Sequence, residues 1–458
     1  MTTSRRKFLT STSALTAGAL AGNLATWGVK SAEAQAASGY KAIVAVFLFG
    51  GSDSNNMIIP YDDYGAYLNV RTAASNVGIP QAQLVQFTGG GKRYGFHPSM
   101  ATLAPLYGQG KMAVIANSGT LVRPIKDRNE YRTVAGVRPP NLFSHSDQQD
   151  QWSGLIPGSS TLTGWGGRFA DRMQAANAGQ LIPAAVSVSG SQLYTLGGTT
   201  APLVVPQNGG VTVSGQGTDA VSMARYNALV SLLKSANPGN QVVVGAASVM
   251  DKALTANNTA NPLLTSTLPP VIDTAFRVNG NLLNTGIAQQ LRQVARLIEG
   301  RASTGVKRQV FFVSMGGYDT HGNTVAAQTN LFNQLFPAMK AFYDYTAAAG
   351  VANDVVQVTM SDFNRTFIGN AGNGVDHAWG GHQVVVGGSV KGNAMYGAFP
   401  DLAVAGNMDS GNNGAWIPGI GVDQVGSTLG KWLGMPDSDI AQVFPNLANF
   451  TTKNIGFI

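Results

Sequence analysis

The sequence has 458 residues, of which 44% are hydrophobic and 12% are charged, enough for one large domain or for two or three smaller ones. Its net charge is +7, but residues 1–34 contribute four cations and one anion, which leaves +4 on the remainder. Because this charge is small and forms no basic stripe, a nucleic-acid partner is not expected. The chain has no cysteine, which excludes thiolate metal ligands and a cysteine nucleophile.

Residues 1–34 resemble a twin-arginine signal peptide. The segment SRRKFL at residues 4–9 carries the paired arginines, and a weakly apolar stretch rich in Ala, Thr and Leu follows it. Small residues at Ala32 and Ala34 predict cleavage before Gln35. We therefore expect the twin-arginine translocase to export the folded protein to the periplasm or the extracellular space. Residues 35–458 contain no run of about eighteen apolar residues, so no stable membrane anchor is expected.

Four mainly apolar runs predict the strands of a buried sheet. They lie at residues 42–49, 111–116, 309–314 and 355–360. Loops and helical patterns alternate with them, as at residues 330–349, which predicts an α/β/α sandwich with a mainly parallel sheet.

Residues 185–300 have a different pattern and predict a mixed insertion or cap on the sheet domain. Residues 186–213 alternate apolar and small polar side chains, as hairpins do. Residues 223–235 and 282–299 have a helical period, and the uncharged, Asn/Thr/Pro-rich residues 255–270 are expected to connect them.

Acidic side chains follow three of the predicted core strands. Asp53 comes after the first strand, Asp319 after the third and Asp362 after the fourth. Ligands of open α/β sheets bind beyond the carboxyl ends of the strands, so these carboxylates converge if the three strands are neighbours.

Histidines accompany these acids, which points to a metal or anion site. Asp319 and His321 are two residues apart and share one side of an extended segment. Asp362, His377 and His382 lie within twenty-one residues, in a loop between two predicted strands. Asp and His ligands without thiolate fit one or two ions of zinc, manganese, iron or calcium. The alternative is that these residues cap turns.

Ser144 lies where a helix is expected to begin. Ser144 and Asp147 have the spacing of a capping box, which gives Ser144 a structural role. A hydroxyl at a helix N-terminus also lies where backbone N–H groups favour an anion, which suits a nucleophile and the phosphate or sulfate that it attacks. The two roles are compatible.

Several segments together resemble the domain-of-unknown-function family 1501. They are GGSDSNN, FHPSMATLAPLYGQGKMAVI, SHSDQQDQW, GGYDTHG, MSDFNRT and DHAWGGHQVVVGG, and they extend over residues 40–400. The resemblance implies membership of the alkaline phosphatase-like superfamily. It also implies metal ligands on strand-end loops in the order Asp53, nucleophile Ser144, Asp319 with His321, Asp362, and then His377 or His382.

The leading hypothesis is an exported metal-dependent hydrolase or transferase that acts on a phosphate or related ester. Its expected nucleophile is Ser144; its expected metal ligands are Asp53, Asp319, His321, Asp362, His377 and His382; and His145, Arg365 and Asp376 are expected to bind an anionic small-molecule or polymer substrate. The alternative is a non-catalytic envelope protein that keeps the fold and binds a partner or a polysaccharide. Phe363, where related phosphatases carry histidine, favours this alternative, as does the missing sulfatase pattern at Ser144.

Overall fold

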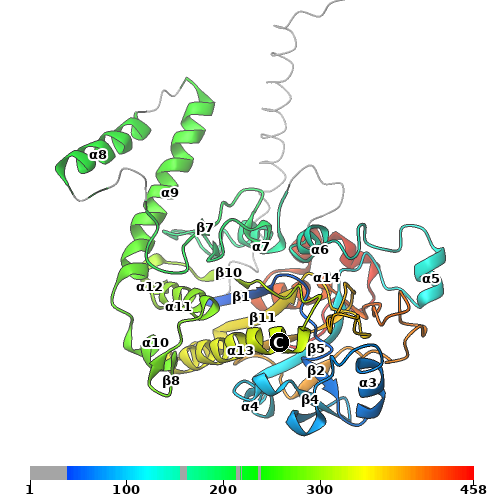
Figure 1. The fold of residues 1–458 in the computed structure, drawn as a ribbon. Helices are drawn as coiled ribbons and strands as arrows, with labels where there is room; N and C mark the ends of the chain where they lie inside the picture. Colours follow the sequence, from blue (N-terminus) through cyan, green and yellow to red (C-terminus); the bar gives the residue numbers. More distant parts are fainter. Residues whose placement is uncertain (1–38, 155–161, 213–216, 218, 236–238) are drawn as a thin grey trace, which may run out of the picture.

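The computed structural model describes residues 39–154, 162–212, 217, 219–235 and 239–458 (Figure 1). The predicted signal peptide at residues 1–34 lies outside these ranges. Among the helices of the described residues, none is both long enough and apolar enough to cross a membrane.

A nine-stranded sheet forms the centre of the molecule. Its order is β13 (Ala394–Tyr396), β5 (Met112–Gly119), β12 (Gly381–Gly387), β11 (Val355–Ser361), β1 (Lys41–Leu48), β10 (Arg308–Met315), β6 (Ala185–Ser187) and β7 (Leu203–Val204), with β14 (Ile420–Gly421) paired to β5. All four predicted core strands belong to this sheet.

The sheet is mainly parallel, as predicted. β11, β1 and β10 are parallel neighbours, so their carboxyl ends meet at one edge. Only β12 runs against its neighbours, because it returns from the loop after β11 and pairs antiparallel with both β11 and β5.

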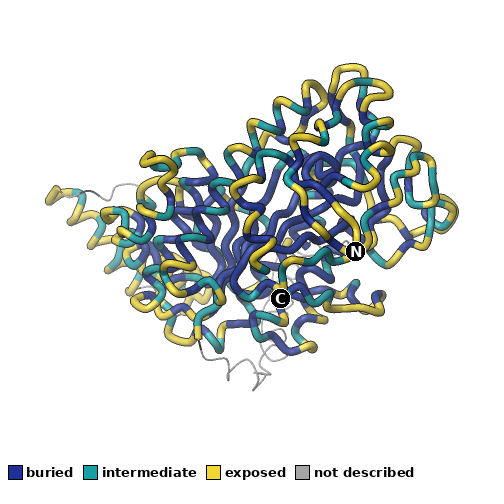
Figure 2. Tube along the Cα trace, turned by 90° about the horizontal axis from the view of Figure 1, so that it is seen from below, coloured by how far each residue is buried: buried dark blue, intermediate teal, exposed yellow. Residues whose placement is uncertain are grey.

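Helices cover both faces of the sheet and complete three layers. One face carries α4 (Pro105–Gly108), α9 (Gln241–Thr265), α10 (Pro270–Ala275), α11 (Gly286–Glu299) and α13 (Thr324–Ala348); the other carries α6 (His145–Trp152), α7 (Trp165–Arg172), α14 (Val422–Leu433) and α15 (Asp437–Val443). Along β1, Val44 and Val46 pack into the first layer while Ile43 and Phe47 pack into the second. Figure 2 shows the buried strands running through the middle of the molecule.

Smaller elements surround the sandwich. A three-stranded antiparallel sheet contains β2 (Ile58–Pro60), β4 (Lys92–Phe96) and β3 (Val85–Gly89); the remaining elements are α3 (Tyr64–Arg71), α5 (Arg128–Thr133), α8 (Ala220–Lys234), α12 (Arg301–Thr304) and the hairpin of β8 (Arg277–Val278) and β9 (Asn281–Leu282).

Within residues 185–300, only part of the chain projects from the sandwich. β6, β7 and α11 belong to the central sheet and its helical layer, and β6 pairs parallel with β7, so the predicted hairpins are wrong here. Residues 255–265 are helical as the second half of α9, not a connection. Figure 1 shows α8 and the beginning of α9 standing away from the sandwich.

Candidate metal centre

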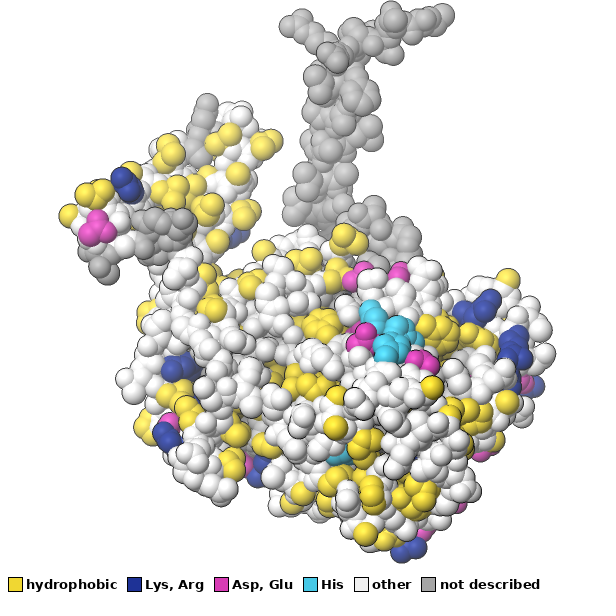
Figure 3. Space-filling model, in the orientation of Figure 1, with side chains coloured by type: hydrophobic (Ala, Val, Ile, Leu, Met, Phe, Trp, Pro, Cys, Tyr) yellow, Lys and Arg dark blue, Asp and Glu magenta, His cyan; other side chains and the backbone are white. Residues whose placement is uncertain are grey.

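Three histidines and an aspartate gather at the carboxyl edge of the sheet. Asp319 and His321 lie in the loop between β10 and α13, His145 is the first residue of α6, and His377 lies in the loop between β11 and β12. Figure 3 shows histidine side chains together on one face, with acidic side chains beside them. The ligand atoms of His145, Asp319 and His377 lie within 4.8 Å of one another.

Glycine at the end of β1 allows this close approach. Gly50 has a φ of +110°, and a Cβ at this position would lie 2.5 Å from the backbone nitrogen of Asp319. Its N–H donates to the carboxylate of Asp362, directly after β11, at 3.2 Å. Gly50 therefore lets the loops after three adjacent strands touch.

Each of the three histidines has its Nδ1 bound to an acceptor. His145 Nδ1 lies 2.6 Å from Asp362 Oδ2, His321 Nδ1 lies 2.9 Å from Asp376 Oδ1, and His377 Nδ1 lies 2.7 Å from the carbonyl oxygen of Phe143. Carboxylate and carbonyl oxygens only accept hydrogen bonds, so each Nδ1 carries the proton. In the neutral rings, each Nε2 then carries a lone pair, and that of His321 also accepts a long hydrogen bond of 3.4 Å from Arg365 Nη1. Metal-bound histidines are oriented in this way by their outer hydrogen bonds.

His145, Asp319 and His377 form the group of mutually close ligand atoms, and His321 contacts two of its members, Asp319 and His377. Asp319 Oδ1 lies 3.5 Å from Nε2 of His145, 3.0 Å from Nε2 of His321 and 3.6 Å from Nε2 of His377. Tetrahedral bonds of about 2.0–2.2 Å place neighbouring ligand atoms about 3.3–3.6 Å apart. The Nε2 atoms of His321 and His377 are 3.0 Å apart, and their facing lone pairs repel unless a cation or a proton lies between them. The Nε2 of His145 is buried without a hydrogen-bond partner.

The charges around the cluster also favour a divalent cation. Burial alone would raise the pKa of Asp319, but the Arg365 guanidinium holds it below its usual value. The pKa of Asp376 is also lowered, because hydrogen bonds from Asn370 and His321 outweigh its burial. Burial lowers the pKa of His377, which disfavours a proton on this ring. The lowered pKa values of Asp319 and Asp376 keep both carboxylates ionised beside the rings, so a bound cation would offset their negative charge.

Phe363 supports the rings that face the centre. Its ring centroid lies 4.8 Å from that of His145 and 4.7 Å from that of His377. It also covers Gly51, where a Cβ would approach Phe363 to 2.5 Å. Phe363 therefore fixes two candidate ligands by packing against them.

Asp53 and His382 do not join this cluster. The Asp53 carboxylate is paired with Arg71, and both side chains are completely buried. His382 lies within β12, where its Nδ1 accepts the backbone N–H of Asn117 at 3.2 Å and its ring stacks on Phe399. Its proton is therefore on Nε2, which leaves neither nitrogen with a lone pair for the centre.

The buried side chains of Arg365 and Asp362 form hydrogen bonds with residues of the cluster. The guanidinium of Arg365 is buried and donates to Asp319 Oδ1 at 2.6 Å, to the carbonyl oxygens of Gly50, Gly51 and Val375, and to His321 Nε2. These bonds use its N–H groups, so it is not free to clamp a substrate anion as predicted. Asp362 is buried and orients His145 without reaching into the cluster.

Ser144 occupies the N-cap position of α6, as the sequence predicts for the helix start. Its hydroxyl donates to the side chain of Asp147 at 2.5 Å and makes no capping bond to the backbone. The hydroxyl therefore has a carboxylate acceptor next to His145. The hydrogen bonds from Asn141 and Ser144 lower the pKa of Asp147, which keeps this acceptor ionised.

A family profile described as "Protein of unknown function (DUF1501)" matches residues 40–411. The chain belongs to the DUF1501 family. This match confirms the family resemblance of the sequence motifs, and it includes every residue of the cluster.

Other comparisons add little to the description of this DUF1501 protein. Comparison with curated proteins finds no match. A solved structure titled "Crystal structure of Ps i-CgsB in complex with k-i-k-neocarrahexaose" is 8% identical, with a TM-score of 0.32, over 88% of this chain and 74% of that chain. A second, "Crystal structure of Ps i-CgsB", is also 8% identical, with a TM-score of 0.31, over 91% of this chain and 77% of that chain. TM-scores this low do not establish a common fold.

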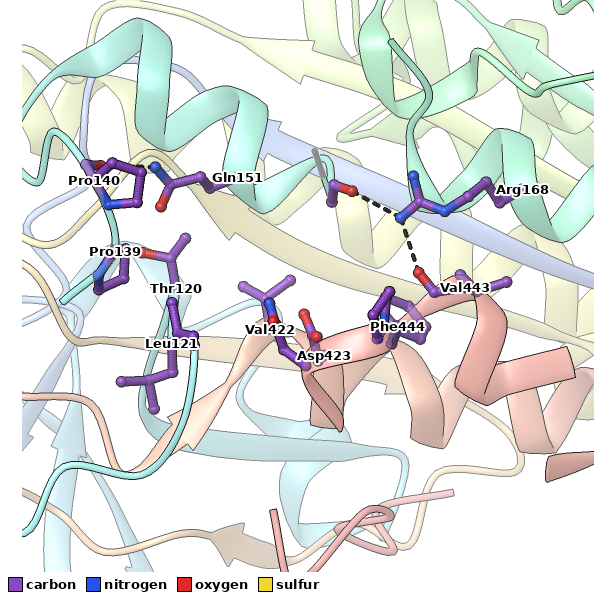
Figure 4. Close-up of a pocket in the computed structure, with 14 residues that line it drawn as sticks. Thr120, Leu121, Pro139, Pro140, Gln151, Arg168, Val422, Asp423, Val443 and Phe444 are labelled. Atoms are coloured by element: carbon purple, nitrogen blue, oxygen red, sulfur yellow. Dashed lines mark hydrogen bonds between the residues drawn. The ribbon is translucent and has the colours of Figure 1, made fainter. Parts of the chain in front are cut away.

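The DUF1501 protein has a cavity of about 40 Å³ between α6, α7 and α14 (Figure 4). Arg168 lines it and donates to the carbonyl oxygens of Gly154 and Val443 at 2.7 and 3.0 Å. Burial raises the pKa of Asp423, across the cavity, to about 7, while the charge of Arg168 lowers it. The cavity has room for a water molecule, not for a substrate.

Two features of the DUF1501 site go beyond the sequence prediction. His145 was expected to bind substrate, but its Nε2 faces the candidate ligands. Gln149, one helical turn later on α6, donates to Asp362 at 2.9 Å and so supports the same carboxylate. The spacing of four residues between His145 and Gln149 was the available signal, because such pairs share a helix face.

Proposed function

We propose that the protein is a metal-dependent hydrolase whose reaction takes place at one divalent ion held by His145, Asp319, His321 and His377. The observation that supports this is the convergence of three imidazole lone pairs on one carboxylate, with every Nδ1 proton already bound to an acceptor. A bound ion would act as a Lewis acid and lower the pKa of a coordinated oxygen group. The nitrogen and oxygen ligands suit zinc, manganese or iron better than calcium.

The proposed substrate is a phosphate or related ester. Ser144 supports this assignment, because its hydroxyl lies at the N-terminus of α6, where N–H groups favour an anion. Asp147 accepts the hydrogen bond of this hydroxyl and is placed to take its proton during attack on the ester. An alkaline phosphatase-like ancestry and export through the twin-arginine translocase to the periplasm or beyond belong to the same proposal.

The first experiment measures bound metal by mass spectrometry in the full chain purified after metal-replete expression. We expect about one equivalent of a transition metal in the wild type, because tight sites retain their ion. Asp319→Asn should lower the metal affinity 10- to 100-fold or more, since even the loss of an outer partner has this effect. Asp401→Asn makes the same chemical change at an exposed site outside the cluster and should retain the metal.

The second experiment measures hydrolysis of 4-nitrophenyl phosphate and 4-nitrophenyl sulfate by the metal-loaded protein. Turnover that disappears in Asp319→Asn and persists in Asp401→Asn would support the hydrolase. Stoichiometric metal without any turnover would instead favour the non-catalytic alternative. That alternative has some structural support in the exposed apolar side chains of α8 and α9, which include Leu232, Val242 and Val249.

A further inference from the structure

A pocket of about 450 Å³ opens directly beside the metal centre. It shares His321, Asp376 and His377 with the centre. Its remaining lining residues are Tyr131, Phe143, Ser410, Gly411, Asn413 and Ala415. The volume lies in the range of roughly 300–1,000 Å³ that small-molecule sites occupy. A molecule that reacts at the centre would therefore have room to place its remainder here.

The charge of the lining disfavours a second anionic group. Asp376 is the one carboxylate among the lining residues, and its Oδ1 accepts hydrogen bonds from His321 Nδ1 and Asn370 Nδ2. No lysine or arginine is among the residues that line the pocket. Arg138 packs over the ring of Tyr131, 5.2 Å from its centroid, but it is not a lining residue. Apart from an ion in the centre itself, an anion in the pocket would therefore face the carboxylate of Asp376 and no lining cation.

The other lining groups suit a hydroxyl-rich ring. Phe143 is half-buried and provides apolar ring surface beside the buried Tyr131, on which the C–H face of a sugar can pack. Asn413 is exposed and offers an amide that both donates and accepts, while Asp376 offers a carboxylate acceptor. Hydroxyl groups both donate and accept hydrogen bonds, so they match this combination.

The wall that carries Ser410, Gly411 and Asn413 is held in place from inside. The buried carboxylate of Asp409 accepts four backbone N–H groups, those of Ala405, Gly411, Gly414 and Ala415, at 2.8–3.0 Å. Arg128 of α5 also donates to the carbonyl oxygen of Ala405 and to the side chain of Asn412. A wall ordered before binding lowers the entropic cost of binding a ligand.

We propose that this pocket binds the alcohol part of the substrate and that this part is an uncharged, hydroxyl-rich group such as a sugar. This inference rests on the proposed function and names its substrate class, a phosphate or related ester of a neutral polyol. In the overall reaction, the bond between phosphorus or sulfur and the alcohol oxygen breaks. The hydroxyl of water adds to phosphorus or sulfur, and the proton of water goes to the alcohol.

Saturation-transfer NMR on the full chain after removal of metal with EDTA tests the pocket without requiring turnover, because no ion beside the pocket then attracts the charged probe. The probes are methyl β-glucoside and methyl β-glucuronide, which differ mainly by one carboxylate. We expect the glucoside to bind about tenfold or more tightly than the glucuronide, because only the anion is repelled by Asp376. Asn413→Ala should weaken glucoside binding roughly 2- to 10-fold, as the loss of a hydrogen bond does.

Two further variants make the test decisive. Asn413→Trp fills the pocket and should abolish glucoside binding, whereas Asn413→Lys should shift the preference toward the glucuronide. Asn330→Ala, on the exposed side of α13, is the matched control and should bind like the wild type. Equal binding of the two probes to the wild type, or unchanged glucoside binding by Asn413→Trp, would overturn the proposal.

The outcomes also separate this inference from the hydrolase. Selective glucoside binding by a chain that hydrolyses no ester would retain the pocket assignment and reject the hydrolase. Hydrolysis of 4-nitrophenyl phosphate by a chain that does not distinguish the two probes would retain the hydrolase and reject the pocket assignment.

Discussion

The carboxylate of Asp362 accepts hydrogen bonds from His145 Nδ1, Gln149 Nε2 and the backbone N–H of Gly50. Asp362→Asn preserves the shape but replaces one acceptor oxygen with a donor. If His145 is a ligand, we expect the metal affinity to fall 10- to 100-fold, as for other outer partners of metal-bound histidines. Metal content after dialysis against graded concentrations of a chelator measures this change.

The response to EDTA provides the control for this variant. EDTA should lower the melting temperature of the wild type, because ligand binding stabilises the folded state. Asp362→Asn should respond much less, since it has less bound metal to lose. Equal metal content and equal EDTA responses in the two proteins would show that the carboxylate does not support a metal site.

Because the ring of His382 is buried, we expect the free energy of unfolding to depend on pH. Burial lowers the pKa of its ring from 6.5 to about 3. Between these values the unfolded chain binds a proton that the folded chain does not, so the stability falls as the pH falls. His382→Gln keeps an acceptor for the N–H of Asn117 and removes this titration. Urea unfolding should show that the variant loses about 2 kcal/mol less than the wild type between pH 7 and pH 5. Parallel losses would contradict the prediction.

At the scale of elements, Asp409 organises the loop that forms one wall of the 450 Å³ pocket. Asp409→Ala removes the acceptor of four backbone N–H groups, so we expect a loss of about 3 kcal/mol and local opening of the loop. Hydrogen exchange of residues 405–415 should accelerate strongly while β1 and β10 stay protected. Asp401→Ala, at an exposed position near this loop, is the control. Similar exchange in the two variants would mean that other contacts hold the loop.

The main strands were predictable because buried strands are rich in apolar residues, which the sequence shows directly. β1, β5, β10 and β11 each contain a run of mainly apolar residues, and buried parallel strands have this composition. The direction of β12 was not predictable, since its apolar residues pack equally well in either direction. The helix at residues 255–265 was missed because Asn and Thr have low helix propensity, which the packing of Ala256, Ala260 and Leu264 overrides.

The candidate site was predictable only in part, for a similar reason. Asp319, His321 and His377 follow core strands, so the sheet order brings them together. His145 lies on a helix, and its sequence neighbours give no sign of which nitrogen faces inward. The exclusion of Asp53 depends on Arg71, eighteen residues away, and only the folded chain reveals this pair.

At the scale of the whole molecule, the proposed export route can be tested at the signal peptide. Replacement of Arg5 and Arg6 with lysine keeps the charge but removes the paired guanidinium groups that the translocase recognises. We expect the full-length protein to accumulate in the cytoplasm, as measured by cell fractionation and immunoblotting. Thr3→Ala, which leaves Arg5, Arg6 and Lys7 unchanged, serves as the control. Normal export of the double-lysine variant would reject the twin-arginine assignment.

The centre is assembled from parts of the chain that are far apart in sequence. His145 and its partner Asp362 are 217 residues apart, and His377 lies 234 residues from the carbonyl of Phe143. The candidate ligands therefore meet only after β1, β10 and β11 have paired, so uptake of the proposed ion is expected late in folding. A ribosome-bound or half-folded chain would have no affinity for the ion. Metal incorporation would then require the completed sheet, and the amount of bound metal would report how much of the protein is fully folded.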